Sequence, residues 1–135
     1  MEWIGGSSIQ YDYEIKHNIN DVMHVKTVTL DTIIPNNLTI NFIKMDVEGA
    51  ECHILHGAQE TIKRSTDIKA IMEWNVSLQA RASTDVSNCL NALYKDNFSF
   101  FKIIDNGDLL PMSVNELETT PDHIDIFLDR VPEEV

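Results

Sequence analysis

Hydrophobic and polar residues follow two different periods along this chain, and the sharpest change of period lies between Ile40 and Ile62. Residues 40–47 form a nearly continuous apolar run that is short and rich in β-forming residues, which predicts a strand covered on both faces. After this run, apolar side chains recur at spacings of three and four, on Ala50, Ile54, Leu55, Ala58 and Ile62. This spacing is one face of an amphipathic helix. The segment is therefore predicted to be a buried strand that turns into a helix across residues 46–49.

The other segments of the chain predict further strands and helices. Alternating residues predict a half-buried strand over 25–30, followed by a short turn of helix that ends at Pro35. A second apolar strand is expected over 68–75, and a polar loop over 76–84. The pattern then predicts a helix over 84–96, a strand over 98–104, a turn at Asn106-Gly107 with a short return strand, one helical turn over 113–118 and a last strand over 123–128.

The order of these elements indicates the fold class. Strand, helix and strand in succession over residues 40–75 form a βαβ unit, so its two strands are predicted to be parallel. The fold class is therefore α/β, with a mostly parallel sheet between layers of helices and an antiparallel hairpin near the C-terminus. Residues 1–24 are expected to be irregular and residues 130–135 to be a frayed tail. No repeat or linker divides the chain, which predicts a single domain over residues 1–135.

Acidic residues follow the two strands of the predicted βαβ unit. Asp46 and Glu48 come at the end of the first strand, and Glu73 comes at the end of the second, just before Asn75. The carboxyl ends of parallel strands meet at one edge of a sheet, and open α/β sheets bind their ligands there. We therefore expect these carboxylates to converge in a candidate site.

Glu51 is a further candidate because its position on the helix is unusual for a charged residue. At about 100° per residue it falls inside the arc of apolar residues, so its side chain is predicted to face inward. A buried carboxylate needs a partner or takes up a proton. Two interpretations remain open at this point, namely that Glu51 caps free backbone N–H groups or that it faces a cleft.

Composition excludes several classes of partner. Lys and Arg together number 10 and Asp and Glu number 22, which gives a net charge of −12 in 135 residues. This charge repels nucleic acid and anionic lipid, so we expect neither as a partner. The chain has no run of about 18 apolar residues and no secretory leader pattern, which predicts a cytoplasmic protein without a membrane span.

Cysteine, histidine and tryptophan residues could take part in catalysis or ligand binding, but we predict structural or solvent-exposed roles for them here. Cys52 and Cys89 are the two cysteines of the chain, and we predict ordinary thiols in a reducing compartment. His53 and His56 have a metal-like spacing with Cys52, but both lie on the helix face away from the core, so no metal site is predicted there. Trp74 could stack on a bound ring, although filling the core is the favoured interpretation.

Several of these motifs occur together and in order. Thr29-Leu30-Asp31 precedes Ile43 to Glu51, which reads IKMDVEGAE, and Leu55 to Ala58 reads LHGA. Over roughly Val25 to Arg130 the chain resembles the FkbM family of S-adenosylmethionine-dependent methyltransferases. The resemblance implies a Rossmann-like class I methyltransferase fold, incomplete at the N-terminus. In such folds a glycine-rich turn and an acid that bind the cofactor would precede Val25, where we see no matching pattern, so the cofactor-binding residues stay unknown.

The resemblance also implies an activity, which is transfer of a methyl group from S-adenosylmethionine to the hydroxyl of a small molecule or saccharide. Asp46 would lie nearest the transferred methyl group, and Glu48, Glu51 and Glu73 match acids of the family motif. Their expected role is to accept a proton from the hydroxyl, or to hold a divalent ion that activates it. Capping of the helix by Asp46 and Glu48 is the structural alternative. Without the cofactor half, the chain alone is expected to be nearly inactive.

Two readings compete with the enzyme. If the fold is incomplete, the strand over 40–47 has an open apolar edge, which a second copy, residues 1–25 or the strand over 25–30 could cover. The chain would then be a truncated, non-catalytic remnant that binds a partner or self-associates. A cation-binding module built from Asp46, Glu48, Glu51 and Glu73 is a third possibility.

Overall fold

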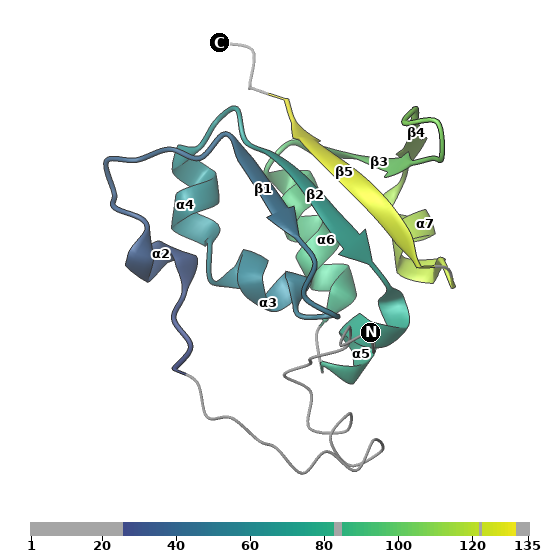
Figure 1. The fold of residues 1–135 in the computed structure, drawn as a ribbon, viewed down its shortest axis with the longest axis horizontal. Coiled ribbons are helices and arrows are strands. Elements are labelled where there is room, and N and C mark those ends of the chain that lie inside the picture. Colours follow the sequence, from purple (N-terminus) through teal and green to yellow (C-terminus); the bar gives the residue numbers. More distant parts are fainter. Residues whose placement is uncertain (1–25, 83–84, 122, 132–135) are drawn as a thin grey trace, which may run out of the picture.

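The computed structural model describes residues 26–82, 85–121 and 123–131, which form one five-stranded sheet with helices packed on one of its faces (Figure 1). The strands are β1 (Phe42–Met45), β2 (Lys69–Trp74), β3 (Phe98–Ile103), β4 (Leu109–Met112) and β5 (Ile124–Arg130). The helices are α2 (Leu30–Ile33), α3 (Glu51–His56), α4 (Gln59–Arg64), α5 (Val76–Arg81), α6 (Val86–Lys95) and α7 (Val114–Thr119). Among these residues no helix is long and apolar enough to cross a membrane.

The sheet is mixed, with the strand order β1-β2-β5-β3-β4. The β1 and β2 strands are parallel, which confirms the predicted βαβ unit, and every other neighbouring pair is antiparallel. The expectation of a mostly parallel sheet was therefore wrong. The reason is that β5 lies between β2 and β3 and runs against both, an arrangement that sequence periodicity does not specify.

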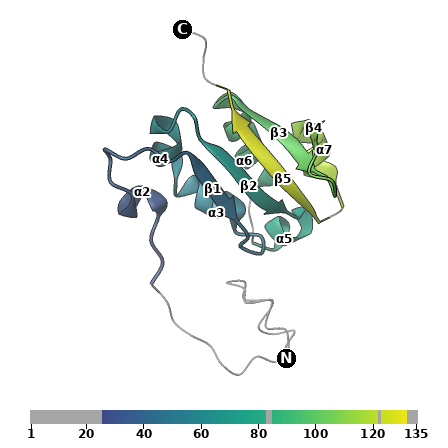
Figure 2. The same ribbon diagram turned by 45° about the horizontal axis from the view of Figure 1, so that its top comes forward.

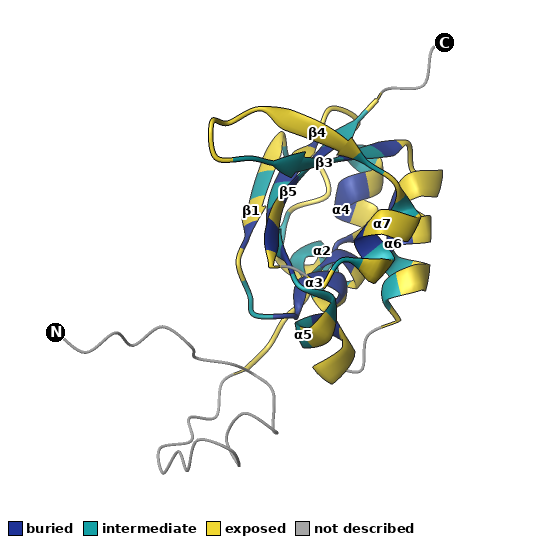
Figure 3. Ribbon diagram, turned by 90° about the vertical axis from the view of Figure 1, so that its right-hand side faces the viewer, coloured by how far each residue is buried: buried dark blue, intermediate teal, exposed yellow. Residues whose placement is uncertain are grey.

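The core lies between the sheet and the helices. Alternate residues of the strands point to the helices and are buried, among them Met72 and Trp74 of β2 and Ile126 of β5. Viewed along the sheet, the described helices lie to one side of it (Figure 3). On the opposite face, Phe42 is 52% exposed, so the prediction of a strand covered on both faces was wrong for the described residues. Trp74 fills the core, as expected, and it donates its Nε1–H to the carbonyl of Leu117.

Two predicted segments adopt a different structure. Residues 26–29 are exposed and irregular, and Leu30 begins α2, so the strand predicted over 25–30 is wrong for its described part. This segment instead docks through Asp31, which accepts hydrogen bonds at the start of α4. Figure 2 shows α2 beside α4 and far from β3 and β4. The predicted loop over 76–84 begins with α5, because the Asn75 side chain caps that helix by accepting from the N–H of Leu78.

Three boundaries also moved. The long helix after β1 is divided into α3 and α4 at Gly57, where a Cβ would lie 3.2 Å from the Thr29 side chain. Arg130 belongs to β5, and its guanidinium donates to the carbonyl of Ile62 at 2.7 Å, so it is not part of a frayed tail. Asp85 caps α6. The expectations for residues 1–25, 83–84 and 132–135 fall outside the described residues.

The prediction that both cysteines are free thiols was also wrong. Cys52 of α3 and Cys89 of α6 form a disulfide, with their Cα atoms 5.9 Å apart. They had been expected to be ordinary thiols, because two cysteines 37 residues apart give no recognisable disulfide framework in a sequence. Only the packing of α3 on α6 brings them together. The argument for a reducing compartment rested on free thiols and loses its support.

Candidate functional site

The candidate site is built on the turn that joins β1 to α3, which we call the acidic turn, residues Asp46 to Gly49. Glu48 and Gly49 have φ values of 53° and 96°, so both adopt the left-handed conformation that L side chains rarely take. Gly49 also lies against α5, since a Cβ there would come within 2.7 Å of the backbone of Leu78. Glycine is required at this position both by its conformation and by this close contact.

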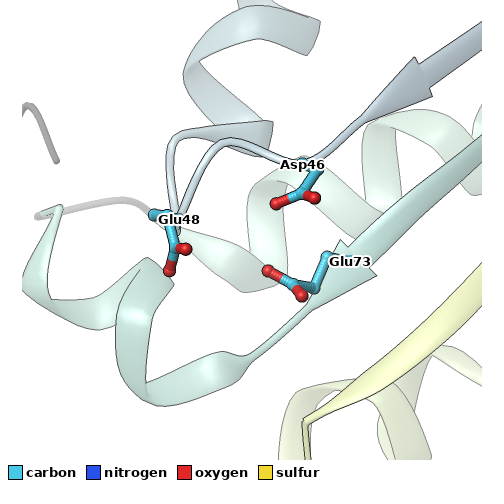
Figure 4. Close-up of side chains that lie close together, drawn as sticks. All are labelled: Asp46, Glu48 and Glu73. Atoms are coloured by element: carbon cyan, nitrogen blue, oxygen red, sulfur yellow. The ribbon is translucent and has the colours of Figure 1, made fainter. Parts of the chain in front are cut away.

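Three carboxylates meet at this turn. One carboxylate oxygen from each of Asp46, Glu48 and Glu73 lies within 4.8 Å of the other two (Figure 4). Asp46 is exposed, whereas Glu48 and Glu73 are partly buried. The convergence follows from the topology, because parallel β1 and β2 end at the same edge and carry the acids to it. The structure thus brings together three of the four predicted site residues.

Two of these acids also lie near basic side chains. Lys44 Nζ is 3.9 Å from Asp46 Oδ2 at an exposed position, and His123 Nε2 is 2.5 Å from Glu73 Oε1. The Lys44–Asp46 pair is exposed and holds its carboxylate weakly because water and salt screen it, whereas Glu73 is partly buried beside His123. Asp46 can therefore exchange its contact with Lys44 for a cation, for a hydroxyl donor or for a proton, which are the partners open to grouped carboxylates.

Glu51 lies beneath the acidic turn and not within the cluster. Its side chain is 1% exposed, and its Oε1 accepts from the backbone N–H groups of Val47 and Gly49, both at 3.4 Å. Burial raises the pKa of Glu51, hydrogen bonds from the backbone oppose the rise, and the negative charge of Glu73 adds to it. Of the two interpretations left open, the structure favours capping of backbone N–H groups.

Gln79 is a residue of this region that sequence analysis missed. It is completely buried on α5, and its Nε2 donates to Glu51 Oε2. It was missed because residues 76–84 were predicted to be a loop, and a glutamine in a loop is normally solvated. The signal that could have found it is Asn75, a preferred helix cap placed directly after a strand.

The other candidates lie apart from the acids. His53 and His56 are exposed, as predicted, and His53 Nε2 lies 2.9 Å from the carbonyl oxygen of Ala82. A groove of about 680 Å³ runs between α3–α4 and α6 and is lined by both histidines and by the disulfide. None of Asp46, Glu48 and Glu73 lines this groove, so it is a feature separate from the candidate site.

Comparison with known proteins gives one match. A family model described as the methyltransferase FkbM domain matches residues 4–125, which is most of the chain. The match begins ahead of Val25, where the motif resemblance had begun. No curated protein and no solved structure matches the chain significantly.

Proposed function

The chain belongs to the FkbM methyltransferase family, and from this premise we propose that it transfers a methyl group from S-adenosylmethionine to a hydroxyl oxygen, with the acidic turn and Glu73 as the site of transfer. The observation that carries the proposal is the convergence of Asp46, Glu48 and Glu73 at the carboxyl ends of two parallel strands. In open α/β sheets this edge is the usual place for a ligand.

The carboxylates fit the cofactor by charge. S-adenosylmethionine bears a positively charged sulfonium and an ammonium group, and grouped carboxylates attract and orient such cations. Asp46, the exposed member of the cluster, is proposed to lie nearest the methyl group that the cofactor supplies. Residues that bind the rest of the cofactor are not assigned.

The chain's own contribution is to position the acceptor and to take its proton. A carboxylate within hydrogen-bonding reach of the hydroxyl accepts its proton as the oxygen attacks, and Asp46 and Glu73 are the candidates for this role. Glu48 is proposed to orient the acceptor. The same three carboxylates are also a suitable set of ligands for a divalent cation such as Mg²⁺, which would lower the pKa of the hydroxyl. Small molecules and saccharides with free hydroxyl groups are the expected acceptors.

The proposal is tested by calorimetric titration with S-adenosylhomocysteine and by methyl transfer from labelled S-adenosylmethionine to a panel of sugars and alcohols. Asp46→Asn should lower turnover by about 100-fold or more if its carboxylate accepts the proton. Asp67→Asn, an exposed acid in the turn before β2, is the matched control and should change neither binding nor turnover. Absence of both binding and transfer in the wild-type chain would disprove the proposal.

The cation is tested separately in the same assay. If a divalent ion activates the hydroxyl, a chelator should abolish turnover and added Mg²⁺ or Mn²⁺ should restore it. Turnover that is unchanged by the chelator would leave proton acceptance by Asp46 or Glu73 as the mechanism. Stabilisation by the cation without any methyl transfer would instead favour a cation-binding module.

We also propose that the open edge of β1 pairs with the same edge of a second copy. Among the described strands β1 has only β2 as a neighbour, and Phe42 is half exposed beside this edge. Antiparallel pairing about a two-fold axis would satisfy the outward backbone groups of both copies. Light scattering should then report a dimer that Phe42→Lys weakens. A monomer at all concentrations would reject this pairing.

A further inference from the structure

The starting observation is a buried pair of polar side chains, Glu51 and Gln79, behind the acidic turn. Both are almost fully buried, and the Nε2 of Gln79 donates to Oε2 of Glu51. The two residues come from different parts of the chain. Glu51 begins α3, directly after the acidic turn, whereas Gln79 lies on α5, the helix that follows β2 and Glu73. The bond therefore connects the segments that supply the two sides of the acidic cluster.

The other oxygen of Glu51 acts on the turn itself. Its Oε1 accepts from the N–H groups of Val47 and Gly49, the two residues that flank Glu48. One carboxylate thus contacts the turn through one oxygen and α5 through the other. The close approach of Gly49 to the Leu78 backbone brings α5 against the turn at the same point. A shift of α5 would consequently move Glu48 relative to Glu73.

The cost of this arrangement is visible at Gln79. Its Oε1 is buried and has no hydrogen-bond partner among the described residues. A buried acceptor without a partner lowers stability, and an apolar side chain of the same size would avoid the loss. Packing alone therefore gives no reason for glutamine here. What glutamine supplies, and methionine or leucine would not, is the donor that holds Oε2 of Glu51.

We propose that Gln79 is a positioning residue for methyl transfer, which acts through Glu51 to hold the acidic turn in register with Glu73. The inference rests on the proposed function for its catalytic consequence, but its structural part stands on the contacts alone. Gln79 touches neither the cofactor nor the acceptor. Its loss should therefore leave the chain folded and loosen the turn, and the reacting groups would meet less often in the productive geometry.

The test is Gln79→Met in the full chain, since methionine keeps the volume and removes the donor. Hydrogen exchange, followed by NMR, should become about tenfold faster or more at the amides of Val47 and Gly49. Turnover with the best acceptor of the panel should fall about tenfold, while the KM for S-adenosylmethionine stays within about twofold. Leu90→Met, a substitution at an equally buried position on α6, is the control and should change none of these values.

The two proposals fail in different ways. If the wild-type chain neither binds S-adenosylhomocysteine nor transfers methyl groups, the proposed function is wrong, while the two amides still report whether Gln79 holds the turn. If both amides keep their protection in Gln79→Met, the positioning role is overturned whatever the activity. A purely structural role would lower global stability and would affect the two amides no more than the rest of the core.

A second measurement covers the case in which Gln79→Met does not fold. In the wild-type chain the side-chain amide protons of Gln79 should exchange far more slowly than those of Gln59, which is exposed on α4 and has its Nε2 3.4 Å from Nδ1 of His56. Donation to a buried carboxylate predicts this protection. Equal exchange at the two side chains would overturn the inference.

Discussion

Several carboxylates in this chain accept from backbone N–H groups at or just before the start of a helix, and two of them, Asp31 and Glu51, do so in opposite surroundings. Asp31 lies near the surface and accepts from the N–H groups of Glu60 and Thr61, at 3.1 and 2.8 Å, and from the Thr61 hydroxyl at 2.7 Å. Glu51 is buried and accepts from its two backbone donors only at 3.4 Å. The shorter bonds belong to the residue that lies outside the candidate site.

The pKa values of the two acids move in opposite directions for this reason. At Asp31 the penalty of burial is outweighed by the hydrogen bonds from Thr61 and Glu60 and by the charge of Arg64, so its pKa is lowered. At Glu51 burial outweighs the longer hydrogen bonds, and the neighbouring charge of Glu73 adds to it, so its pKa is raised. Asp31 behaves as a helix cap supplied from a distant part of the chain. Glu51 holds the acidic turn, but its burial disfavours the charged form that accepts these hydrogen bonds best.

The largest expected effect concerns the disulfide, which lies next to Glu51 and is absent from the surroundings of Asp31. The Cys52–Cys89 disulfide joins α3 to α6 across a sequence separation of 37 residues, and loop entropy predicts a loss of about 4 kcal/mol on reduction. Urea denaturation with and without a dithiol measures this loss. Alkylation of the denatured chain before reduction is the control, and labelling of both cysteines at that stage would show that they are free thiols.

The second effect separates conformation from close packing at the acidic turn. Gly49→Ala should destabilise the chain by about 2–5 kcal/mol, because it adds overlap with the Leu78 backbone to the strain of a positive φ. Gly107→Ala is the matched control, since Gly107 also has a positive φ but nothing within 4 Å of the added Cβ. Its expected cost is about 1–2 kcal/mol. Equal losses in urea denaturation would show that contact with α5 does not matter.

A third substitution tests the Asp31 side of the comparison. Asp31→Ala removes the remote cap of α4 and should cost about 1–2 kcal/mol, as the loss of a helix cap does. S-adenosylhomocysteine binding should stay unchanged, because Asp31 holds the segment before β1 and not the acidic turn. Asp67→Ala, an exposed acid in the turn after α4, serves as the control for loss of charge. A loss of ligand affinity in Asp31→Ala would contradict the division between the two regions.

The smallest effect is the pH dependence, which should have opposite signs at the two acids. The raised pKa of Glu51 means that the unfolded chain releases this proton first, so its contribution is fully present below 4.5 and is lost as pH rises through the folded pKa. The lowered pKa of Asp31 gives a contribution that is present above 3.8 and is lost as pH falls through the folded pKa. Stability differences between wild type and Glu51→Gln or Asp31→Asn, measured across pH, should therefore slope in opposite directions. Equal slopes would refute the contrast.

Much of the fold was predictable because its signals are local. The strand before Asp46, the start of a helix near Ala50, the hairpin turn at Asn106-Gly107 and the helical turn over 113–118 all follow from spacing and residue type, and the structure confirms them. The convergence of Asp46, Glu48 and Glu73 was also predictable, because parallel neighbouring strands end at one edge.

The missed features depend on contacts between distant segments. The exposed residues 26–29 alternate like a strand, but no strand of the described residues pairs with them, and Asp31 docks the segment on α4 instead. The helix over Val76–Arg81 was missed because the sequence of this segment is as polar as that of a loop. Only the packing of the folded chain shows that Gln79 is buried there.

The sequence by itself determined the strand-turn-helix with its inward-facing Glu51, the acids at the sheet edge and the family to which the chain belongs. Period, turn chemistry and motif are properties of neighbouring residues, so they can be read along the chain. Only the tertiary structure decided the insertion of β5 between β2 and β3, the Cys52–Cys89 disulfide and the Glu51–Gln79 pair. Each of these joins segments far apart in sequence, and which distant segments meet is settled by the packing of the whole core.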